Sequence, residues 1–306
     1  MRIAIIGQQD FGKAALEAFV ARGDEVAAVF CAPDKPGARP DALHVAARAL
    51  GLPVLQFASL RSDEAAQAMR ALDVDLAVMA YVLQFAPQAL LGIPKHGTIQ
   101  YHPSLLPKHR GPSSINWPIA MGESETGLTI FRPTDGLDEG PVILQRRCEI
   151  GPDDTLGDVY FKHLFPEGVK ALLEAADLVL AGRHSETAQI EANASYEGWF
   201  RDEEARINWA NPVDQVYNVI RAANPAPGAW CMLGGIKVRL FDSRKHVLRT
   251  FGASRGQPGD IYRLTDNSIF VNAQGGHIEV IRLKPEGGQK MNAAEFARNH
   301  NLAAVA

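Results

Sequence analysis

The sequence is poor in cysteine and has no long apolar run. Its 306 residues include three cysteines, Cys31, Cys148 and Cys231, which lie far apart. An odd number of isolated cysteines is typical of free thiols in a reducing cytoplasm and provides no cluster for a metal ion. No apolar run approaches the roughly 20 residues of a membrane span, and the apolar start ends at Gly7, too early for a signal peptide. These absences predict a cytoplasmic protein without a membrane partner.

Two nucleotide-binding fingerprints are also missing. The Gly-x-Gly-x-x-Gly pattern of dinucleotide sites is absent, which argues against a nucleotide-binding oxidoreductase. Residues 7–13 spell Gly-x4-Gly-Lys, but Ala14 follows where a phosphate-binding loop needs Ser or Thr to hold Mg²⁺. We therefore expect residues 7–13 to form a tight turn, with glycines that permit close packing of a helix against a strand.

Length and charge predict two parts of different character. A chain of 306 residues exceeds what one core usually serves, so two domains are expected. Residues 206–306 hold 13 basic and 7 acidic side chains, a charge of +6, whereas residues 1–205 carry 18 basic and 28 acidic ones, a charge of −10. A basic module can contact an anionic partner such as RNA, or it can be an ordinary surface, because its Lys and Arg residues form no runs.

The patterning of residues 1–205 predicts a Rossmann-like α/β domain. Apolar segments at residues 2–6, 25–31 and 75–80 have the composition of buried strands, and Gly follows the first of them, as in βαβ units. Ser62 is the expected cap of one helix, Thr155 with Asp158 forms a weak capping box at the start of another, and Pro166 should kink or split the latter. The other strands are predicted at residues 53–55, 96–101, 127–132 and 142–150, and the helices at 14–21, 42–50, 63–72, 114–120 and 155–180.

The rest of the chain predicts a small β-rich domain. Residues 183–204 are polar and lack periodicity, so we interpret them as a linker. Short strands punctuated by Gly and Pro follow a helix at residues 213–222, and several such strands within about a hundred residues favour a small barrel or sandwich. The strands are predicted at residues 229–232, 236–241, 259–264, 269–271 and 277–283, with a closing helix at 293–300.

The stretch from Gln100 to Gly111 is the strongest candidate site. The strand before it must stop, because Pro103 and Pro107 each remove a backbone donor and bias the preceding residue away from helix. His102 therefore lies at the carboxyl end of a strand, where open α/β sheets bind their ligands. Residues two apart on a strand share a face, so Gln100 and His102 can point into one site.

This stretch carries a family resemblance. The pattern His-x-Ser-Leu-Leu-Pro-x-x-Arg-Gly of residues 102–111 resembles the signature of the 10-formyltetrahydrofolate-dependent formyltransferases. That family includes methionyl-tRNA formyltransferase, sugar N-formyltransferases and the hydrolase domain of 10-formyltetrahydrofolate dehydrogenase. A second block lies at matching spacing: residues 125–127 resemble the family's Glu-Thr-Gly motif and residues 136–140 its Gly-Leu-Asp-x-Gly motif. Two linked motifs at a fixed separation make the resemblance specific.

The resemblance implies a fold and a chemistry. It implies a Rossmann-like catalytic domain at residues 1–205, an OB-like β domain at residues 206–306, and 10-formyltetrahydrofolate as formyl donor without a metal ion. His102 would be the central catalytic residue and Asp138 its partner carboxylate, acting on a tetrahedral intermediate whose oxygen needs donors aimed at it. Gln100 stands where many relatives carry Asn; it offers the same amide one methylene further out, as a third catalytic candidate.

The resemblance also implies a set of folate-binding residues. The loop after the strand at residues 75–80 would line the folate pocket, largely through backbone groups, and both motif loops would shape the site. Arg110 either faces an anionic substrate or braces its loop. The candidate folate-binding residues are Tyr81, Leu83, Gln84, Phe85, Ala86, Ser104, Leu105, Asp135, Gly136 and Leu137.

The formyl acceptor is left open between an amine, water and methionyl-tRNA. Local features such as residues 101–104, 116–117 and 164–168 resemble the dehydrogenase's hydrolase domain most closely, and with an end at Ala306 we expect no oxidative reaction. Methionyl-tRNA formyltransferase is the alternative: the basic residues 206–306 favour it, whereas the short loop at residues 34–40 and Gln100 oppose it. An alternative of another class is a folate-binding protein without turnover.

Overall fold

The computed structural model describes residues 1–248 and 255–305. The chain divides into two compact units, and each unit is assembled from three separate pieces of the sequence. Unit 1 consists of Met1–Gly111, Gly127–Cys148 and His163–Tyr196, and unit 2 of Pro112–Thr126, Glu149–Lys162 and Glu197–Ala306. The boundary near residue 205 that the sequence suggested stays a prediction.

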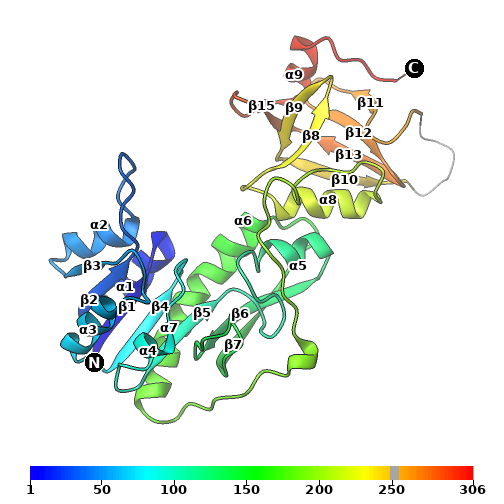
Figure 1. The fold of residues 1–306 in the computed structure, drawn as a ribbon. Coiled ribbons are helices and arrows are strands. Elements are labelled where there is room, and N and C mark those ends of the chain that lie inside the picture. Colours follow the sequence, from blue (N-terminus) through cyan, green and yellow to red (C-terminus); the bar gives the residue numbers. More distant parts are fainter. Residues whose placement is uncertain (249–254, 306) are drawn as a thin grey trace. The chain divides into compact units, whose positions relative to one another are not determined.

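Unit 1 is built on a seven-stranded sheet in the order β3-β2-β1-β4-β5-β6-β7, which Figure 1 shows in blue to green. The first five strands along the chain are parallel, and β6 runs antiparallel to β5. This arrangement confirms the Rossmann-like prediction. The strands are β1 (Arg2–Gly7), β2 (Glu25–Cys31), β3 (Val54–Gln56), β4 (Leu76–Ala80), β5 (Thr98–His102), β6 (Glu125–Phe131) and β7 (Val142–Glu149).

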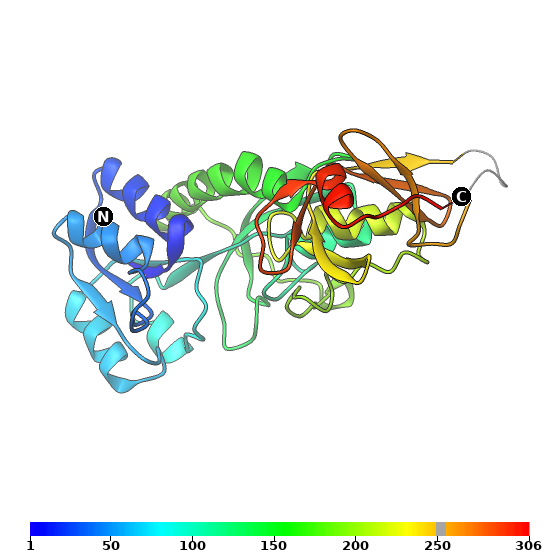
Figure 2. The same cartoon turned by 90° about the horizontal axis from the view of Figure 1, so that it is seen from above.

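Helices cover both faces of this sheet because the buried strands are apolar on both sides. Helices α1 (Gln9–Ala21), α2 (Ala42–Ala49) and α7 (Phe165–Leu180) form one layer, in which α1 lies beside both α2 and α7 (Figure 2). Helices α3 (Asp63–Leu72) and α4 (Gln88–Leu91) cover the other face, where Met69 and Leu90 pack with Ile6 and Met79 of the strands.

Packing around Tyr101 decides which way the site residues point. The Tyr101 ring stacks on Phe11 of α1 with centroids 4.3 Å apart, and its hydroxyl donates to the Leu164 carbonyl at 3.2 Å. Gly168 lets α7 approach this ring, since a Cβ there would lie 2.5 Å from it. Tyr101 thus faces the layer of α1 and α7. Because side chains alternate along a strand, Gln100 and His102 point to the opposite face.

The sequence predicted the N-cap of α3 correctly but the start of α1 incorrectly. Ser62 accepts a hydrogen bond from the Ala65 amide at 3.2 Å, which confirms the predicted cap. The turn predicted at residues 7–13 is wrong from Gln9 onward, because α1 already begins at that residue. Gly12 serves packing inside this helix: a Cβ there would lie 3.2 Å from the Leu43 side chain and 3.3 Å from the Ala80 carbonyl oxygen.

Unit 2 is rich in antiparallel strands, which confirms the β-rich second part (Figure 1). Its described residues form two four-stranded sheets, ordered β10-β13-β12-β11 and β15-β14-β9-β8. The single strand predicted at residues 277–283 is two strands interrupted at Ile281, and β10 and β15 were not predicted. The strands are β8 (Ala229–Leu233), β9 (Ile236–Leu240), β10 (Ser243–Val247), β11 (Ile261–Leu264), β12 (Ile269–Ala273), β13 (Gly276–Val280), β14 (Arg282–Pro285) and β15 (Met291–Asn292).

Unit 2 also contains helices that pack on its strands or on one another. Helix α8 (Val213–Ala222) has the bounds that the sequence predicted and packs on α5 (Asn116–Met121) and β10, while α9 (Ala293–Asn299) follows β15. The side-chain amide of Asn116 donates through Nδ2 to the backbone carbonyl of Ala222 at 2.8 Å. Within residues 1–248 and 255–305, no helix is apolar over a length sufficient to cross a bilayer. The three cysteines are free thiols, as expected.

The helical segment that leads into α7 begins with the predicted capping box. Thr155 accepts from the Asp158 amide at 3.2 Å, and the Asp158 carboxylate accepts from the Thr155 amide at 3.0 Å. The segment then runs through α6 (Leu156–Asp158) and a π-helix (Val159–Leu164) before α7 starts, with Pro166 in the first turn of α7. The break expected near Pro166 therefore takes the form of a π-helical turn just before the proline.

The capping carboxylate gives the fold a testable pH dependence. Desolvation acts to raise the pKa of Asp158, but hydrogen bonds from Lys162 and Thr155 outweigh it and lower the pKa to about 2 from 3.8. A lowered folded-state pKa stabilises the fold above the unfolded value, and the contribution is lost as pH falls through the folded one. We expect Asp158 to account for about 1–2 kcal/mol of the unfolding free energy lost between pH 5 and pH 2.

Denaturant unfolding of the wild type and Asp158→Asn at both pH values measures this contribution. The variant should be less stable at the higher pH and lose less stability on acidification. The exposed Asp10 provides the matched control, since Asp10→Asn should leave the acid loss unchanged. An equal acid loss in Asp158→Asn and the wild type would contradict the prediction.

Candidate active site

The carboxyl end of β5 brings the two principal candidates together. Nδ1 of His102 lies 3.5 Å from Oδ2 of Asp138, and each side chain is 6% exposed. Nε2 of His102 lies 2.9 Å from the carbonyl oxygen of His109. A carbonyl only accepts, so Nε2 carries a proton and donates it to this bond. Nδ1 is then the ring nitrogen that faces the carboxylate, in a buried arrangement suited to proton exchange between an imidazole and an acid.

Asp138 is held in a backbone conformation that few side chains adopt. Its φ is 55°, in the left-handed region, where Asp is among the tolerated residues. The Gly111 amide donates to its Oδ2 at 2.9 Å. Nε2 of Gln189 donates to the carbonyl of Asp138 and to that of Gly140, both at 2.8 Å. Side chain and backbone of the turn are therefore both fixed by hydrogen bonds.

The loop after His102 is braced by the strands beside it. The Thr129 hydroxyl donates to the Ser104 carbonyl at 2.7 Å and accepts from the Leu106 amide at 3.1 Å. Ser104 is fully buried, and its hydroxyl donates to the Lys108 carbonyl at 2.6 Å. Leu105 packs against Gly127, where a Cβ would lie 2.5 Å from its side chain. Ser104 and Leu105 thus stabilise the loop, and their contact with folate stays a prediction.

Arg110 braces the protein. Its side chain is 8% exposed and donates to Oε1 of Gln189 at 3.0 and 3.2 Å. It also donates to both carboxylate oxygens of Glu191, at 3.0 and 2.9 Å. The sequence left open whether Arg110 faces a substrate or braces its loop, and these contacts favour bracing.

Exposed apolar side chains mark the loop after β4. Tyr81, Leu83 and Phe85 are 41%, 55% and 41% exposed, and Leu137 in the loop after β6 is 53% exposed. The two loops are adjacent, because Gln88 donates its backbone amide to the Asp135 carboxylate at 2.9 Å. Exposed apolar side chains gathered in this way are typical of a binding surface.

The remaining candidates lie around these loops. Gln84 donates to the carbonyls of Phe57 and Ala58 at 3.0 and 3.1 Å, so its side chain anchors the loop, and Ala86 is buried. Gly136 turns tightly, since a Cβ there would lie 1.7 Å from the Glu139 carboxylate. Gln100 is half-buried and lies opposite Met79 in the sheet register. All thirteen candidates therefore belong to unit 1.

Sequence reasoning missed the residues that support this site from the segment interpreted as a linker. Residues 183–196 lack strands and long helices, as expected, but Gln189, Glu191 and Ser195 bond to the loops that carry His109, Arg110 and Asp138. No motif or periodicity singles these residues out. A polar stretch without a pattern looks the same whether it is a solvated linker or a brace.

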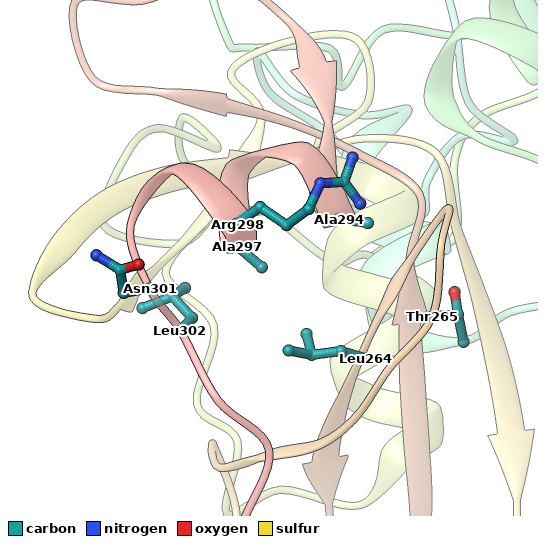
Figure 3. A pocket seen from close by; sticks show the side chains of 7 residues that line it. All are labelled: Leu264, Thr265, Ala294, Ala297, Arg298, Asn301 and Leu302. Carbon is teal, nitrogen blue, oxygen red and sulfur yellow. The ribbon is translucent and has the colours of Figure 1, made fainter.

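Unit 2 contains a pocket of about 400 Å³ whose lining includes no candidate residue. Figure 3 shows its lining: Leu264, Thr265, Ala294, Ala297, Arg298, Asn301 and Leu302. These residues come from the end of β11 and the residue after it, from α9, and from the segment that follows α9, and none is a candidate from the sequence. In the part of the chain that the structure describes, no three His, Cys, Asp or Glu side chains gather as a metal site.

Two family models match the sequence. Residues 1–176 match the model described as "Formyl transferase", and residues 200–301 match "Formyl transferase, C-terminal domain". Mitochondrial 10-formyltetrahydrofolate dehydrogenase of Mus musculus is 37% identical over 97% of this chain, which spans only 33% of that relative. Methionyl-tRNA formyltransferase of Geobacter sulfurreducens is 34% identical over 99% of this chain and 95% of its own length. The chain thus spans about a third of the length of the dehydrogenases and nearly all of the tRNA enzyme.

Solved structures share the fold. An N-formyltransferase from Helicobacter canadensis, in complex with folinic acid and dTDP-3-aminofucose, has a TM-score of 0.70 at 17% identity, with 91% of this chain and 98% of that one covered. HypX from Aquifex aeolicus, in complex with tetrahydrofolic acid, has a TM-score of 0.68 at 20% identity, with 98% of this chain and 47% of that one covered. At these identities the likeness concerns the arrangement of the backbone.

Proposed function

The chain belongs to the formyl transferase family, and we propose that it is an enzyme that uses 10-formyltetrahydrofolate as formyl donor. The formyl group passes either to an amine or to water. The observation that carries this proposal is the buried pair of His102 and Asp138 at the carboxyl end of β5, 3.5 Å apart. Formyl transfer needs acid–base groups at one carbonyl carbon, and this pair supplies them.

The proposed chemistry assigns each proton a route. The nucleophile adds to the formyl carbon and loses one proton, and N10 of the folate gains one proton as the carbon–nitrogen bond breaks. Nε2 of His102 already donates to the His109 carbonyl, so Nδ1 has the donor role. In the protonated imidazole, Nδ1 donates to the oxygen that becomes negative, and Asp138, 3.5 Å from Nδ1, orients the ring and relays the proton. The Gln100 amide, on the same face of β5 as His102, is the second donor to that oxygen.

The proposed folate site is the surface formed by the loops after β4 and β6. Tyr81, Leu83, Phe85 and Leu137 present apolar area that suits the flat rings of a reduced folate. Backbone groups of residues 84–86 and 135–136, together with Ser104 and Leu105, complete the proposed contacts. Folate is here a substrate, and we assign no metal ion to the reaction.

The proposal includes an organisation and a location. Residues 1–205 form the catalytic domain and residues 206–306 an OB-like domain that shapes the choice of acceptor. The protein works in the cytoplasm, as its isolated free thiols favour.

Transfer to initiator methionyl-tRNA is the second candidate function. It is favoured by the match to methionyl-tRNA formyltransferase, which extends over 95% of that relative, and by the +6 charge of residues 206–306. The loop at residues 34–40 is short and contains only two basic residues, Lys35 and Arg39, and this opposes a function that requires binding of tRNA. A folate-binding protein without turnover is opposed by the retained pair of His102 and Asp138.

Turnover of 10-formyltetrahydrofolate by the purified protein tests the proposal. Tetrahydrofolate formation is followed with the protein alone, with a small thiol, and with methionyl-tRNA. We expect turnover with water or thiol. Turnover that requires methionyl-tRNA, and that weakens steeply as salt rises because counterions are released on binding, would establish the second candidate. Folate binding without turnover in these mixtures and with amino sugars or amino acids would support the folate-binding protein instead.

A further inference from the structure

The segment at residues 187–196 fastens both loops of the candidate site. Thr187 and Val142 exchange backbone hydrogen bonds of 2.8 and 2.9 Å. The Ser195 hydroxyl accepts from the His109 amide at 2.9 Å, and its carbonyl accepts from the Arg110 amide at 3.0 Å. Gln189 lies between these two ends and contacts the Asp138 turn. The segment thus joins the loop after β5 to the loop before β7.

The direction of the Gln189 amide is set by its neighbour. Arg110 has donors alone, so its Nε and Nη2 can bond only the amide oxygen, at 3.2 and 3.0 Å. The amide nitrogen must then face away from Arg110. It donates to the carbonyls of Asp138 and Gly140 at 2.8 Å each, which uses both of its protons. The guanidinium stays oriented because Glu191 accepts two further bonds from it.

The carbonyls that Gln189 holds belong to a turn in need of support. Asp138 has a φ of 55°, which costs an L residue conformational energy unless its surroundings fix it. Its carboxylate is tied through the Gly111 amide at 2.9 Å, and it faces His102 at 3.5 Å. A shift of the turn backbone moves the carboxylate with it, because the side chain has few bonds in which to compensate.

We infer that Gln189 is a positioning residue: by donating to the carbonyls of Asp138 and Gly140, it keeps the Asp138 carboxylate against His102. The kinetic part of this inference rests on the proposed function, whereas the positioning part concerns the turn itself. A displacement of about 1 Å in an active-site group can lower a rate by roughly 10²-fold. We therefore expect loss of the Gln189 donor to lower kcat.

Two variants distinguish the donor from the acceptor function of the Gln189 side-chain amide. Gln189→Met removes donor and acceptor at similar length, and Gln189→Glu keeps the acceptor for Arg110 but turns an oxygen toward the two carbonyls. Both should lower kcat for 10-formyltetrahydrofolate by roughly 10²-fold with KM changed less than about threefold. The controls Gln67→Met and Gln67→Glu alter an exposed glutamine of α3 and should retain wild-type kinetics. Wild-type kcat in Gln189→Glu would overturn the inference, because the contact with Arg110 alone would then suffice.

Hydrogen exchange of the Gly111 amide provides a readout that needs no activity. This amide donates to Asp138, so Gln189→Met should accelerate its exchange by about tenfold or more while amides of β1 and β4 keep their protection. Unchanged protection of Gly111, or loss of protection throughout the core, would overturn the inference. If the wild type fails to turn over 10-formyltetrahydrofolate, the proposed function fails, and the Gly111 exchange still decides whether Gln189 holds the turn.

A double variant checks that Gln189 acts through Asp138. In the Asp138→Ala background, Gln189→Met should lower kcat no further, because the carboxylate that it positions is already absent. An additional loss equal to that in the wild-type background would show an independent effect and overturn the inference.

Discussion

Replacing His102 with alanine is expected to lower kcat for formyl release from 10-formyltetrahydrofolate by about 10³-fold. The imidazole is the titratable group at the carboxyl end of β5, with one nitrogen toward the Asp138 carboxylate and the other donating to the His109 carbonyl. Without it, the developing oxyanion loses a donor and the proton loses its route. Steady-state rates of tetrahydrofolate formation measure the effect, with thermal unfolding as a check of the fold.

A second variant and a control make this prediction specific. Gln at position 102 can still donate to the His109 carbonyl but cannot carry a proton, so His102→Gln should be nearly as inactive as His102→Ala. The exposed His96 precedes the same strand, and His96→Ala should retain wild-type kcat. Activity within a few-fold of wild type in His102→Gln would refute a role for this imidazole in proton transfer.

Asp138→Asn is expected to lower kcat by roughly 10²-fold at nearly unchanged folate affinity. Asparagine has almost the same shape, and its amide oxygen can still accept from Gly111, so the turn is preserved. What disappears is the negative charge beside His102 and the capacity to take up a proton. The measurement is kcat together with folate binding by titration calorimetry.

The neighbouring Glu139 provides the matched control for this charge. It is exposed, and Glu139→Gln removes one carboxylate from the same turn without touching the contact to His102. We expect its kcat to stay within about twofold of wild type. Equal losses in Asp138→Asn and Glu139→Gln would mean that the general charge of the turn matters and that Asp138 has no distinct role.

Elements with strong local signals were predictable from the sequence. Continuous apolar strands, the Ser62 cap and the Thr155–Asp158 box depend on residues close together in the chain, and the structure contains each of them. The four-residue helix α4 is too short to have a period, and β10 reads Ser-Arg-Lys-His-Val, a polar pattern stabilised by pairing with β13. The start of α1 was missed because Gly12 is needed for packing against distant residues.

Within the candidate site, only the residues with a clear signal in the sequence could be predicted. His102 follows a strand and precedes two prolines, and the family motifs drew attention to Asp138. The contact between them joins residues from different loops of the fold, and the 3.5 Å separation became visible only with the fold itself. Gln189 gives no such signal, because its contribution is two hydrogen bonds to backbone carbonyls, and such bonds leave no motif in the sequence.

Because the two units alternate along the chain, the fold limits which segments the protein can exchange with its relatives by recombination. The chain passes between the units five times, so no single cut releases both of them whole. A fragment of residues 206–306 would lack α5, whose Asn116 bonds the end of α8 at 2.8 Å, and Asp153, which accepts from the Tyr217 hydroxyl at 3.0 Å. If the second domain of another protein were joined near residue 205, its side chains would not match Asn116 and Asp153, and these contacts would be lost. The two units should therefore have evolved together and not have been exchanged separately. Chimeras between relatives should fold only when the segments at residues 112–126 and 149–162 come from the same parent as the C-terminal part.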